Sequence, residues 1–273
     1  MIEQMTHSLH DISTFAVDLG LQAGELMEKE QRNAQYETSF KNHQELVTSV
    51  DLKVDELIHK RIRANYPDHA ILSEENMSDI SKVGDLNGPL WVIDPIDGTV
   101  NFAHGHYQVA VSIAYFEDGE AKIGVVHCPF QKETFHAMRG QYSLRNHKPI
   151  QISGETNLRQ ALVATGFPYD KSRLPELIQR LQAVMMECQD IRRIGSAALD
   201  ICWVAMGRLD AYYETVSPWD CAAARLIAQE AGARCGNLTA APDDMPAELY
   251  SKDLLIASPA LYQPLADILL KTL

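Results

Sequence analysis

Apolar residues recur at intervals of three and four in two stretches near the start of the chain. The first covers residues 9–27, and its spacing predicts one long amphipathic helix with one face on a core. The second begins after Thr48, a plausible N-cap because Asp51 stands three residues later, as in a capping box. A second helix is therefore predicted from this point, ending before Pro67.

Short apolar runs separated by turn residues predict strands in the next part of the chain. Asp118-Gly119 lies between two of these runs and marks a hairpin. The expected strands cover residues 70–73, 90–93, 109–116, 121–127 and 133–138. Beyond residue 150 the two patterns alternate, with strands at 161–165 and 209–214 and helices at 174–188, 196–206 and from Trp219 onward.

This change of pattern predicts two halves of different class. Residues 1–148 are expected to form an α+β subdomain, and residues 149–273 an α/β subdomain. The boundary is placed in the polar, turn-forming stretch 145–155. With 273 residues, 46% of them hydrophobic, the chain is long enough for one large domain or two packed subdomains.

Charge limits the kinds of partner. The chain has 37 Asp and Glu against 24 Lys and Arg, a net charge of −13, and no basic cluster. Nucleic acid is therefore not expected as a main partner, because binding to a phosphate backbone needs a basic surface. An acidic protein that handles an anionic substrate needs positive charge between the two, and divalent cations supply it.

The cysteines and the first residues of the sequence indicate the cellular compartment in which the protein is expected. Five widely spaced cysteines without a Cys-x-x-Cys pair favour a reducing environment. No run approaches the roughly 18 apolar residues of a membrane span, and the first residues are acidic and polar. A cytoplasmic location and no membrane partner are therefore expected.

The most informative segment places two acids directly after an apolar run. Asp94 and Asp97 are three residues apart, and Pro95 between them restricts the backbone. The two carboxylates and the carbonyl of Ile96 are hard oxygen ligands that suit magnesium. Gly98, which has no Cβ, would let backbone N–H groups approach a phosphate. A solvent-exposed turn explains the same pentapeptide equally well.

Three further segments carry candidate groups that also have simple structural explanations. Glu74-Glu75 follows an apolar run and reads equally as a solvated loop. Asp220 stands in the first turn of a predicted helix, where an acid complements the helix dipole. Gly195-Ser196-Ala197 fits a loop and an N-cap, and its N–H groups are also candidates for ligand recognition.

These blocks in this order resemble the inositol monophosphatase family, within the lithium-sensitive, magnesium-dependent phosphatase superfamily. The blocks are Glu-Glu, Asp-Pro-Ile-Asp-Gly-Thr-x-Asn-Phe, Gly-Ser-Ala-Ala and Trp-Asp. The resemblance implies a layered αβαβα sandwich, with an antiparallel sheet in the N-terminal half and the site at the junction of the halves. It also implies a homodimer.

The resemblance assigns metal ligands and catalytic groups. Glu74, Asp94 and the carbonyl of Ile96 would bind a first Mg²⁺. Asp94, Asp97 and Asp220 would bind a second, and Glu74 would also reach a weaker third. Thr99, paired with Asp51, would orient and deprotonate a metal-activated water for in-line attack on phosphorus, and Glu74 would be a further catalytic residue.

The implied substrate contacts are less regular than the metal ligands. They are Asp97, Gly98, Thr99, Gly195, Ser196, Ala197 and Glu214, with Lys41 as a mobile-loop residue near the metals. Two positions depart from the family pattern. Ser73 stands where glycine is frequent, and Glu214 lies six residues before Asp220 instead of the expected seven.

The resemblance implies a Mg²⁺-dependent phosphatase for myo-inositol 1-phosphate and related polyol or sugar monophosphates. Phosphatases for histidinol phosphate, fructose 1,6-bisphosphate, NADP or adenosine 3′,5′-bisphosphate remain as alternatives with similar metal motifs. A regulatory binding protein with vestigial catalysis is a different class of answer, and it predicts lost metal ligands.

Overall fold

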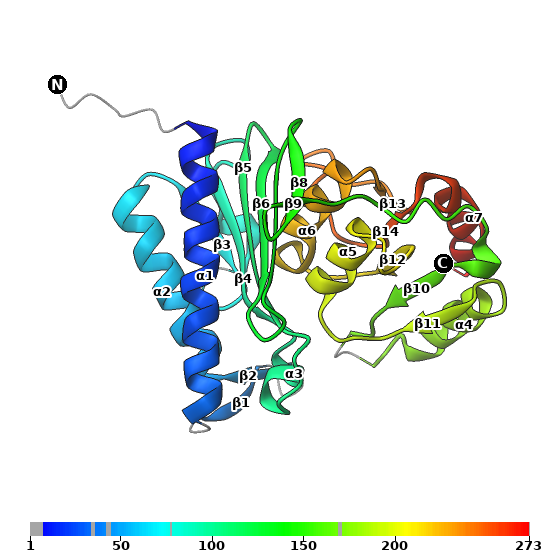
Figure 1. The fold of residues 1–273 in the computed structure, drawn as a ribbon, viewed down its shortest axis with the longest axis horizontal. Helices are drawn as coiled ribbons and strands as arrows, with labels where there is room; N and C mark the ends of the chain where they lie inside the picture. Colours follow the sequence, from blue (N-terminus) through cyan, green and yellow to red (C-terminus); the bar gives the residue numbers. More distant parts are fainter. Residues whose placement is uncertain (1–7, 34–35, 42–44, 77, 169–170, 273) are drawn as a thin grey trace.

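Two helices cover one face of the larger sheet. The computed structural model describes residues 8–33, 36–41, 45–76, 78–168 and 171–272. Helices α1 (Leu9–Asn33) and α2 (Ser49–Asn65) form the outer layer of Figure 1. Thr48 and Asp51 form the expected capping box at the start of α2. The apolar stripes of both helices meet Trp91, Ile113 and Val125 of the sheet in one buried cluster.

The larger sheet has seven strands in chain order. They are β3 (Ala70–Ser73), β4 (Leu90–Asp97), β5 (Ala110–Glu117), β6 (Glu120–Cys128), β7 (Glu133–Met138), β8 (Tyr142–Arg145) and β9 (Lys148–Pro149). The β3–β4 pair is parallel and the other pairs are antiparallel. All eight residues of β4 are buried, which fits a strand covered on both faces.

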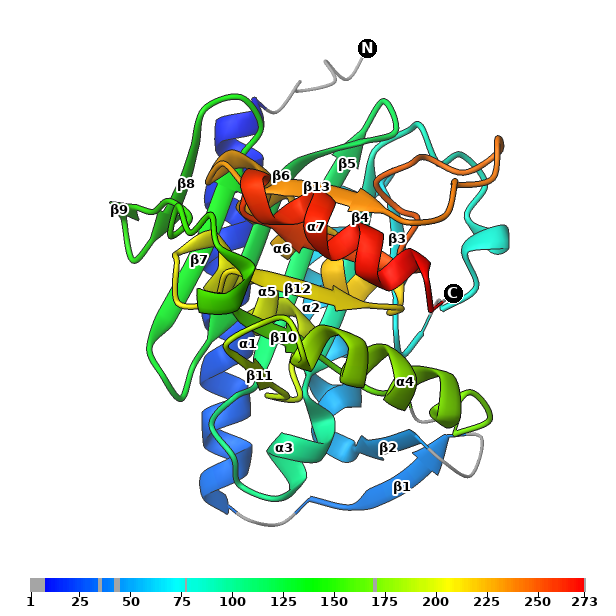
Figure 2. The same cartoon turned by 90° about the vertical axis from the view of Figure 1, so that its right-hand side faces the viewer.

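The smaller sheet lies on the far side of two further helices. Its order is β11 (Asp190–Arg192), β10 (Leu162–Thr165), β12 (Ala211–Glu214), β14 (Leu254–Ala257) and β13 (Arg234–Asn237). Helices α5 (Ala197–Ala205) and α6 (Pro218–Glu230) lie between the sheets, and α4 (Leu174–Met185) and α7 (Pro259–Leu270) cover the outer face (Figures 1 and 2). Alternation along β12 sends Tyr212 toward α5 and α6 and Tyr213 toward α4 and α7.

The αβαβα sandwich predicted from the sequence is therefore confirmed. The described chain also contains elements that the sequence did not predict. They are β1 (Thr38–Lys41), β2 (Glu45–Thr48), α3 (Thr99–Ala103), the 3₁₀ turns Ile80–Lys82 and Leu158–Gln160, β8, β9, β11, β13, β14 and α7. Because α5 and α6 share one core with the larger sheet, the split at residues 148 and 149 stays a prediction. No helix in the described ranges is long and apolar enough to cross a bilayer.

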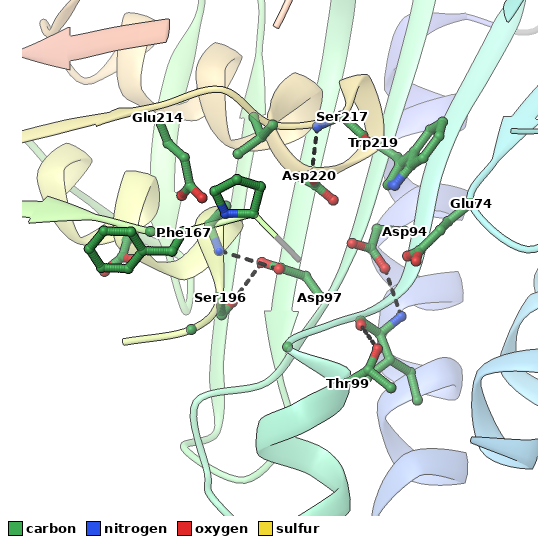
Figure 3. A pocket seen from close by; sticks show the side chains of 18 of the residues that line it. Glu74, Asp94, Asp97, Thr99, Phe167, Ser196, Glu214, Ser217, Trp219 and Asp220 are labelled. Carbon is green, nitrogen blue, oxygen red and sulfur yellow. Dashed lines mark hydrogen bonds between the residues drawn. The ribbon is translucent and has the colours of Figure 1, made fainter. Parts of the chain in front are cut away.

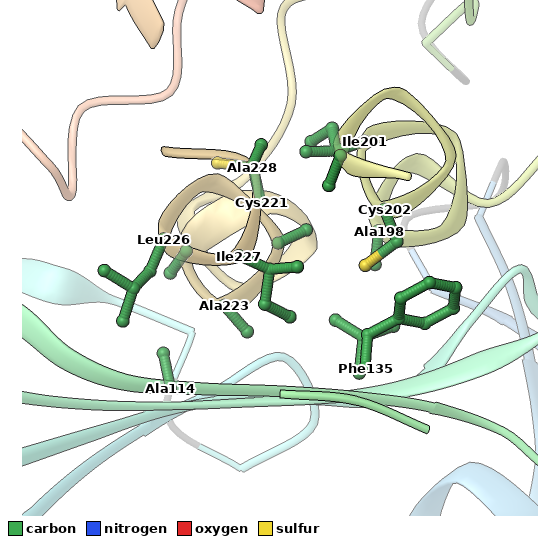
Figure 4. Close-up of a cluster of buried hydrophobic side chains, with 14 of the residues drawn as sticks. Ala114, Phe135, Ala198, Ile201, Cys202, Cys221, Ala223, Leu226, Ile227 and Ala228 are labelled. Carbon is green, nitrogen blue, oxygen red and sulfur yellow. The ribbon is translucent and has the colours of Figure 1, made fainter. Parts of the chain in front are cut away.

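Close packing of α6 on the larger sheet brings the two halves together. Small residues of α6, among them Ala223, face the sheet, with Ile227 and Leu226 beside them (Figure 4). A Cβ on Gly124 of β6 would lie 2.5 Å from the carbonyl oxygen of Ala223. Any larger residue at Gly124 would therefore push helix and sheet apart.

We expect Gly124→Ala to lower the free energy of unfolding by about 2 kcal/mol, because overpacking a tight core costs about 1–3 kcal/mol. Urea unfolding followed by circular dichroism measures the change. Gly84→Ala is the matched control, since a Cβ there meets no described atom within 4 Å. Equal unfolding midpoints for the two variants would contradict this view of the interface.

Candidate metal centre

The end of β4 carries two acids into the junction between the sheets. Asp94 pairs with Ser112 and Asp97 pairs with Ala110, and the register shifts between the two pairs. Residues three apart on a regular strand point to opposite faces, so a regular strand would separate these carboxylates. The shift inserts an extra residue in β4, a β-bulge, and both acids face the same cavity.

The third acid comes from the other half of the chain. Asp220 lies in the first turn of α6 and forms a capping box with Ser217, whose N–H donates to Asp220 Oδ2 at 2.8 Å. The helix-capping explanation of Asp220 is thus correct, and the side chain also reaches the β4 acids. Asp94, Asp97 and Asp220 each offer one oxygen, and these oxygens all lie within 4.8 Å of one another.

The N-terminus of α5 holds Asp97 in place. Its Oδ2 accepts from Ser196 Oγ at 2.6 Å and from the Ala198 N–H at 2.7 Å, and Oδ1 accepts from the Ala197 N–H at 3.3 Å. A helix N-terminus stabilises a carboxylate in this position. The sequence predicted Ser196 and Ala197 as substrate contacts. Both line the cavity with Gly195, but their donor groups bind Asp97.

Glu74 completes the acidic group from the end of β3. Figure 3 shows its carboxylate beside Asp94. Lys41 Nζ donates to Glu74 Oε1 at 3.3 Å and to Glu75 Oε1. Lys41 therefore lies close to the acids and offsets part of their charge.

Asp55 of α2 fixes the loop that carries Glu74 and Glu75. Its buried carboxylate accepts from Ser73 Oγ before the two glutamates and from Asn76 Nδ2 after them. The hydroxyl of Ser73 thus has a structural use at a position where the resemblance led us to expect glycine.

A hydroxyl and a second buried acid stand behind the β4 acids. Thr99 Oγ1 lies 3.0 Å from Asp51 Oδ1 and 3.1 Å from the carbonyl oxygen of Ile96. Asp51 is 1% exposed and does not itself line the cavity, whereas Thr99 and Gly98 do. Gly98 has a φ of 96°, a backbone conformation that favours glycine, and it turns the chain into α3.

Burial raises the pKa of every acid in the group. It raises the pKa of Asp97 to about 6, against the opposing hydrogen bonds from α5. Burial and then the charge of Asp97 raise the pKa of Asp220 to about 8. For Glu74 burial outweighs Lys41 and raises the pKa to about 9. Burial and the neighbouring acids hold the pKa of Asp94 well above its usual value.

The acids open into a cavity of about 360 Å³. Glu214 lies on the wall away from Glu74, where its Oε2 accepts from the Tyr212 hydroxyl at 2.7 Å. Sequence reasoning missed two charged residues of this wall, Arg193 and Asp200. Among the described lining residues Arg193 is the only cationic one. The spacing of Ser196 and Asp200, four residues apart on one helix, was an available signal.

The donor set fits a hard divalent cation. Three carboxylates with oxygens within 4.8 Å, two of them buried and that of Asp220 half-buried, need positive charge to ionise together. Carboxylate and carbonyl oxygens are the ligands that Mg²⁺ and Mn²⁺ prefer. Glu74 and Ile96 line the same cavity as these three acids.

The raised pKa values predict how stability depends on pH. These acids bind protons more tightly in the native state than in the unfolded state, where their pKa values are about 4. The metal-free protein should therefore lose stability as the pH rises from about 5 to 8. A cation that binds the ionised acids should raise the melting temperature more at about pH 8 than at about pH 5.5.

Scanning calorimetry in EDTA and in excess Mg²⁺ at both pH values measures this difference. Asp94→Asn should flatten the pH dependence of the metal-free protein, because one buried acid no longer titrates. An equal effect of Mg²⁺ at both pH values would contradict the assignment.

Comparisons with known proteins identify the family. The family model described as the inositol monophosphatase family matches residues 8–270. A Vibrio cholerae relative called "Nus factor SuhB" is 35% identical over 254 residues, 92% of each chain. A Synechocystis "Inositol-1-monophosphatase" is 37% identical over 235 residues, 84% of this chain and 78% of the relative. The solved inositol monophosphatase from Anabaena superposes with a TM-score of 0.82 at 30% identity, covering 96% of each chain. The chain therefore belongs to the inositol monophosphatase family.

Proposed function

We propose that this phosphatase is Mg²⁺-dependent and hydrolyses myo-inositol 1-phosphate and related polyol or sugar monophosphates. The observation that carries the proposal is the convergence of Asp94, Asp97 and Asp220, from both halves of the chain, at a 360 Å³ cavity. The cavity has room for a small phosphorylated alcohol, and its acids need cations before they can accept an anionic phosphate.

We assign the metal ligands as the sequence suggested. Glu74, Asp94, Asp97, Asp220 and the carbonyl of Ile96 would hold two to three Mg²⁺ ions. When bound, the ions would lower the pKa of an attacking water and stabilise the charge on the phosphoryl group and the leaving oxygen.

Thr99 and Asp51 would orient the attacking water. Thr99 has one hydroxyl proton and two acceptors in reach, Asp51 Oδ1 and the Ile96 carbonyl. If the carbonyl binds a cation, the proton points to Asp51 and the oxygen of Thr99 is free to accept from a water. Asp51 is fixed for this role because its Oδ2 accepts from the Thr48 N–H at 2.8 Å.

The wall around Glu214 supports a polyol as the leaving group. Glu214 and Asp200 are acids that outnumber the single guanidinium of Arg193 at this wall, so a second phosphate would find fewer donors there than several hydroxyls would find acceptors. Bisphosphate substrates are therefore less favoured than monophosphates with several hydroxyls. The six-residue spacing from Glu214 to Asp220 leaves histidinol phosphate and NADP phosphatase as alternatives.

The intact acidic group also bears on the non-catalytic alternative. A vestigial site would be expected to lose ligands, and here each predicted ligand has an oxygen-bearing group at the cavity. Several relatives carry the name "Nus factor SuhB", which describes those proteins. The retained acids favour a working phosphatase in this chain.

Phosphate release from a panel of inositol 1-phosphate, histidinol phosphate, fructose 1,6-bisphosphate, NADP and adenosine 3′,5′-bisphosphate tests the proposal. We expect Mg²⁺-dependent release, fastest from inositol 1-phosphate and abolished by EDTA. Asp94→Asn should lower kcat at least about 100-fold, since charge stabilisation by the ions is worth several kcal/mol.

Asp68→Asn is the matched control, because Asp68 is exposed and does not line the cavity. It should hydrolyse the panel like the wild type. Release that survives both EDTA and Asp94→Asn would overturn the mechanism. Release that is fastest from another member of the panel would overturn the substrate alone.

A further inference from the structure

Asp200 is a buried acid that lines the cavity and has an unpartnered carboxylate oxygen. It lies in the first turn of α5, is 2% exposed and lines the cavity. Its Oδ1 is buried and has no hydrogen-bond partner within the described part of the chain. Buried polar atoms are almost always paired, so an unpaired one at a cavity indicates a missing ligand.

Capping of α5 does not explain this acid. The first N–H groups of the helix are already paired, those of Ala197 and Ala198 with Asp97 and that of Leu199 with Ser196 Oγ at 3.4 Å. The N–H of Asp200 itself donates to the Ser196 carbonyl in the regular helical pattern. The carboxyl is therefore free for another partner.

The neighbouring acids differ from Asp200 in this respect. Asp97 is held by three donors from α5, and Glu214 accepts from Tyr212. Seven other described residues have a buried unpartnered side-chain atom, and none of them lines this cavity. Asp200 is thus distinguished both by its missing partner and by its place on the substrate wall.

The charges near Asp200 indicate what it would bind. Burial first, and then the charges of Glu214 and Asp97, raise the pKa of Asp200, while Arg193 opposes this. A wall that combines two further acids with one guanidinium offers both acceptors and donors. A neutral alcohol matches it, because a hydroxyl accepts and donates, whichever protonation state the carboxyl has.

We propose that Asp200 is a specificity-determining residue that hydrogen-bonds a hydroxyl group of the leaving alcohol. This inference rests on the proposed function and identifies the Asp200 carboxyl as a group that recognises the alcohol part of the substrate. A site built to hydrogen-bond a substrate hydroxyl discriminates strongly against analogues that lack it, because its own polar group is then left unpaired.

The test compares inositol 1-phosphate with phenyl phosphate, a monoester without hydroxyls. Asp200→Ala should lower kcat/KM for inositol 1-phosphate about tenfold or more, the loss expected for a buried hydrogen bond to a carboxyl. For phenyl phosphate kcat/KM should change less than about twofold, because the metal ligands are intact. Asp200→Asn, whose amide still bonds a hydroxyl, should keep most of the preference for inositol 1-phosphate.

A panel of monodeoxy-inositol 1-phosphates identifies the hydroxyl. With the wild type, kcat/KM for one analogue should be about tenfold lower than for inositol 1-phosphate. With Asp200→Ala, kcat/KM for that analogue and for inositol 1-phosphate should be equal. If Asp200→Ala does not fold, Asp200→Leu carries the test, because leucine has a similar volume but cannot form the hydrogen bond and should likewise lose the discrimination against that analogue.

Asp210→Ala is the control for general damage. Asp210 binds the Leu162 N–H at 2.7 Å, lies outside the cavity lining and should affect stability without changing the ratio of the two substrates. An equal loss on both substrates in Asp200→Ala, or no loss on either, would overturn the role of Asp200. Wild-type protein that releases phosphate from neither substrate would instead overturn the proposed function, and this inference with it.

Discussion

The repulsion among clustered, largely buried carboxylates at the junction of the two sheets is the constraint on which the rest of this structure depends. Asp94, Asp97 and Asp220 place oxygens within 4.8 Å of one another. At that separation two ionised groups repel by about 3 kcal/mol with an effective dielectric constant of about 20. Local donors hold each acid in place, such as the N–H groups of α5 for Asp97. They do not supply a full positive charge, which is why a divalent cation fits.

The layered fold serves to bring these acids together. Helices α5 and α6 begin at the cavity and then run between the two sheets. The N-terminus of α5 stabilises Asp97 of β4, and the first turn of α6 carries Asp220. Ser112 of β5 donates to the carbonyl of Trp219 at 3.1 Å, which ties the start of α6 to the larger sheet. The close approach at Gly124 keeps α6 on that sheet. A cation held by these acids would therefore link metal binding to the packing of the two halves.

Sequence reasoning predicted the elements with strong periodicity and the acids of the site, but not how the acids converge. The apolar stripes of α1 and α2 and the capping box at Thr48 are local signals in the sequence, and the structure confirms the elements that they predict. Strands of three or four residues such as β11 and β13 are too short for an alternation of apolar and polar residues to be recognised in the sequence. The capping of α5 by Asp97 joins positions about 100 residues apart, and Asp200 stands out only through its missing partner. Such facts depend on tertiary packing, which one sequence does not encode locally.

The central claim is that acids from both halves of the chain form one metal site. Titration with Mn²⁺, followed by electron paramagnetic resonance at about pH 8, tests it directly, because Mn²⁺ prefers the same oxygen ligands as Mg²⁺. Asp220→Asn removes only the acid contributed by α6 and should weaken binding at least about tenfold relative to the wild type and to Asp68→Asn. Asp220→Asn protein that binds Mn²⁺ as tightly as Asp68→Asn would contradict the account.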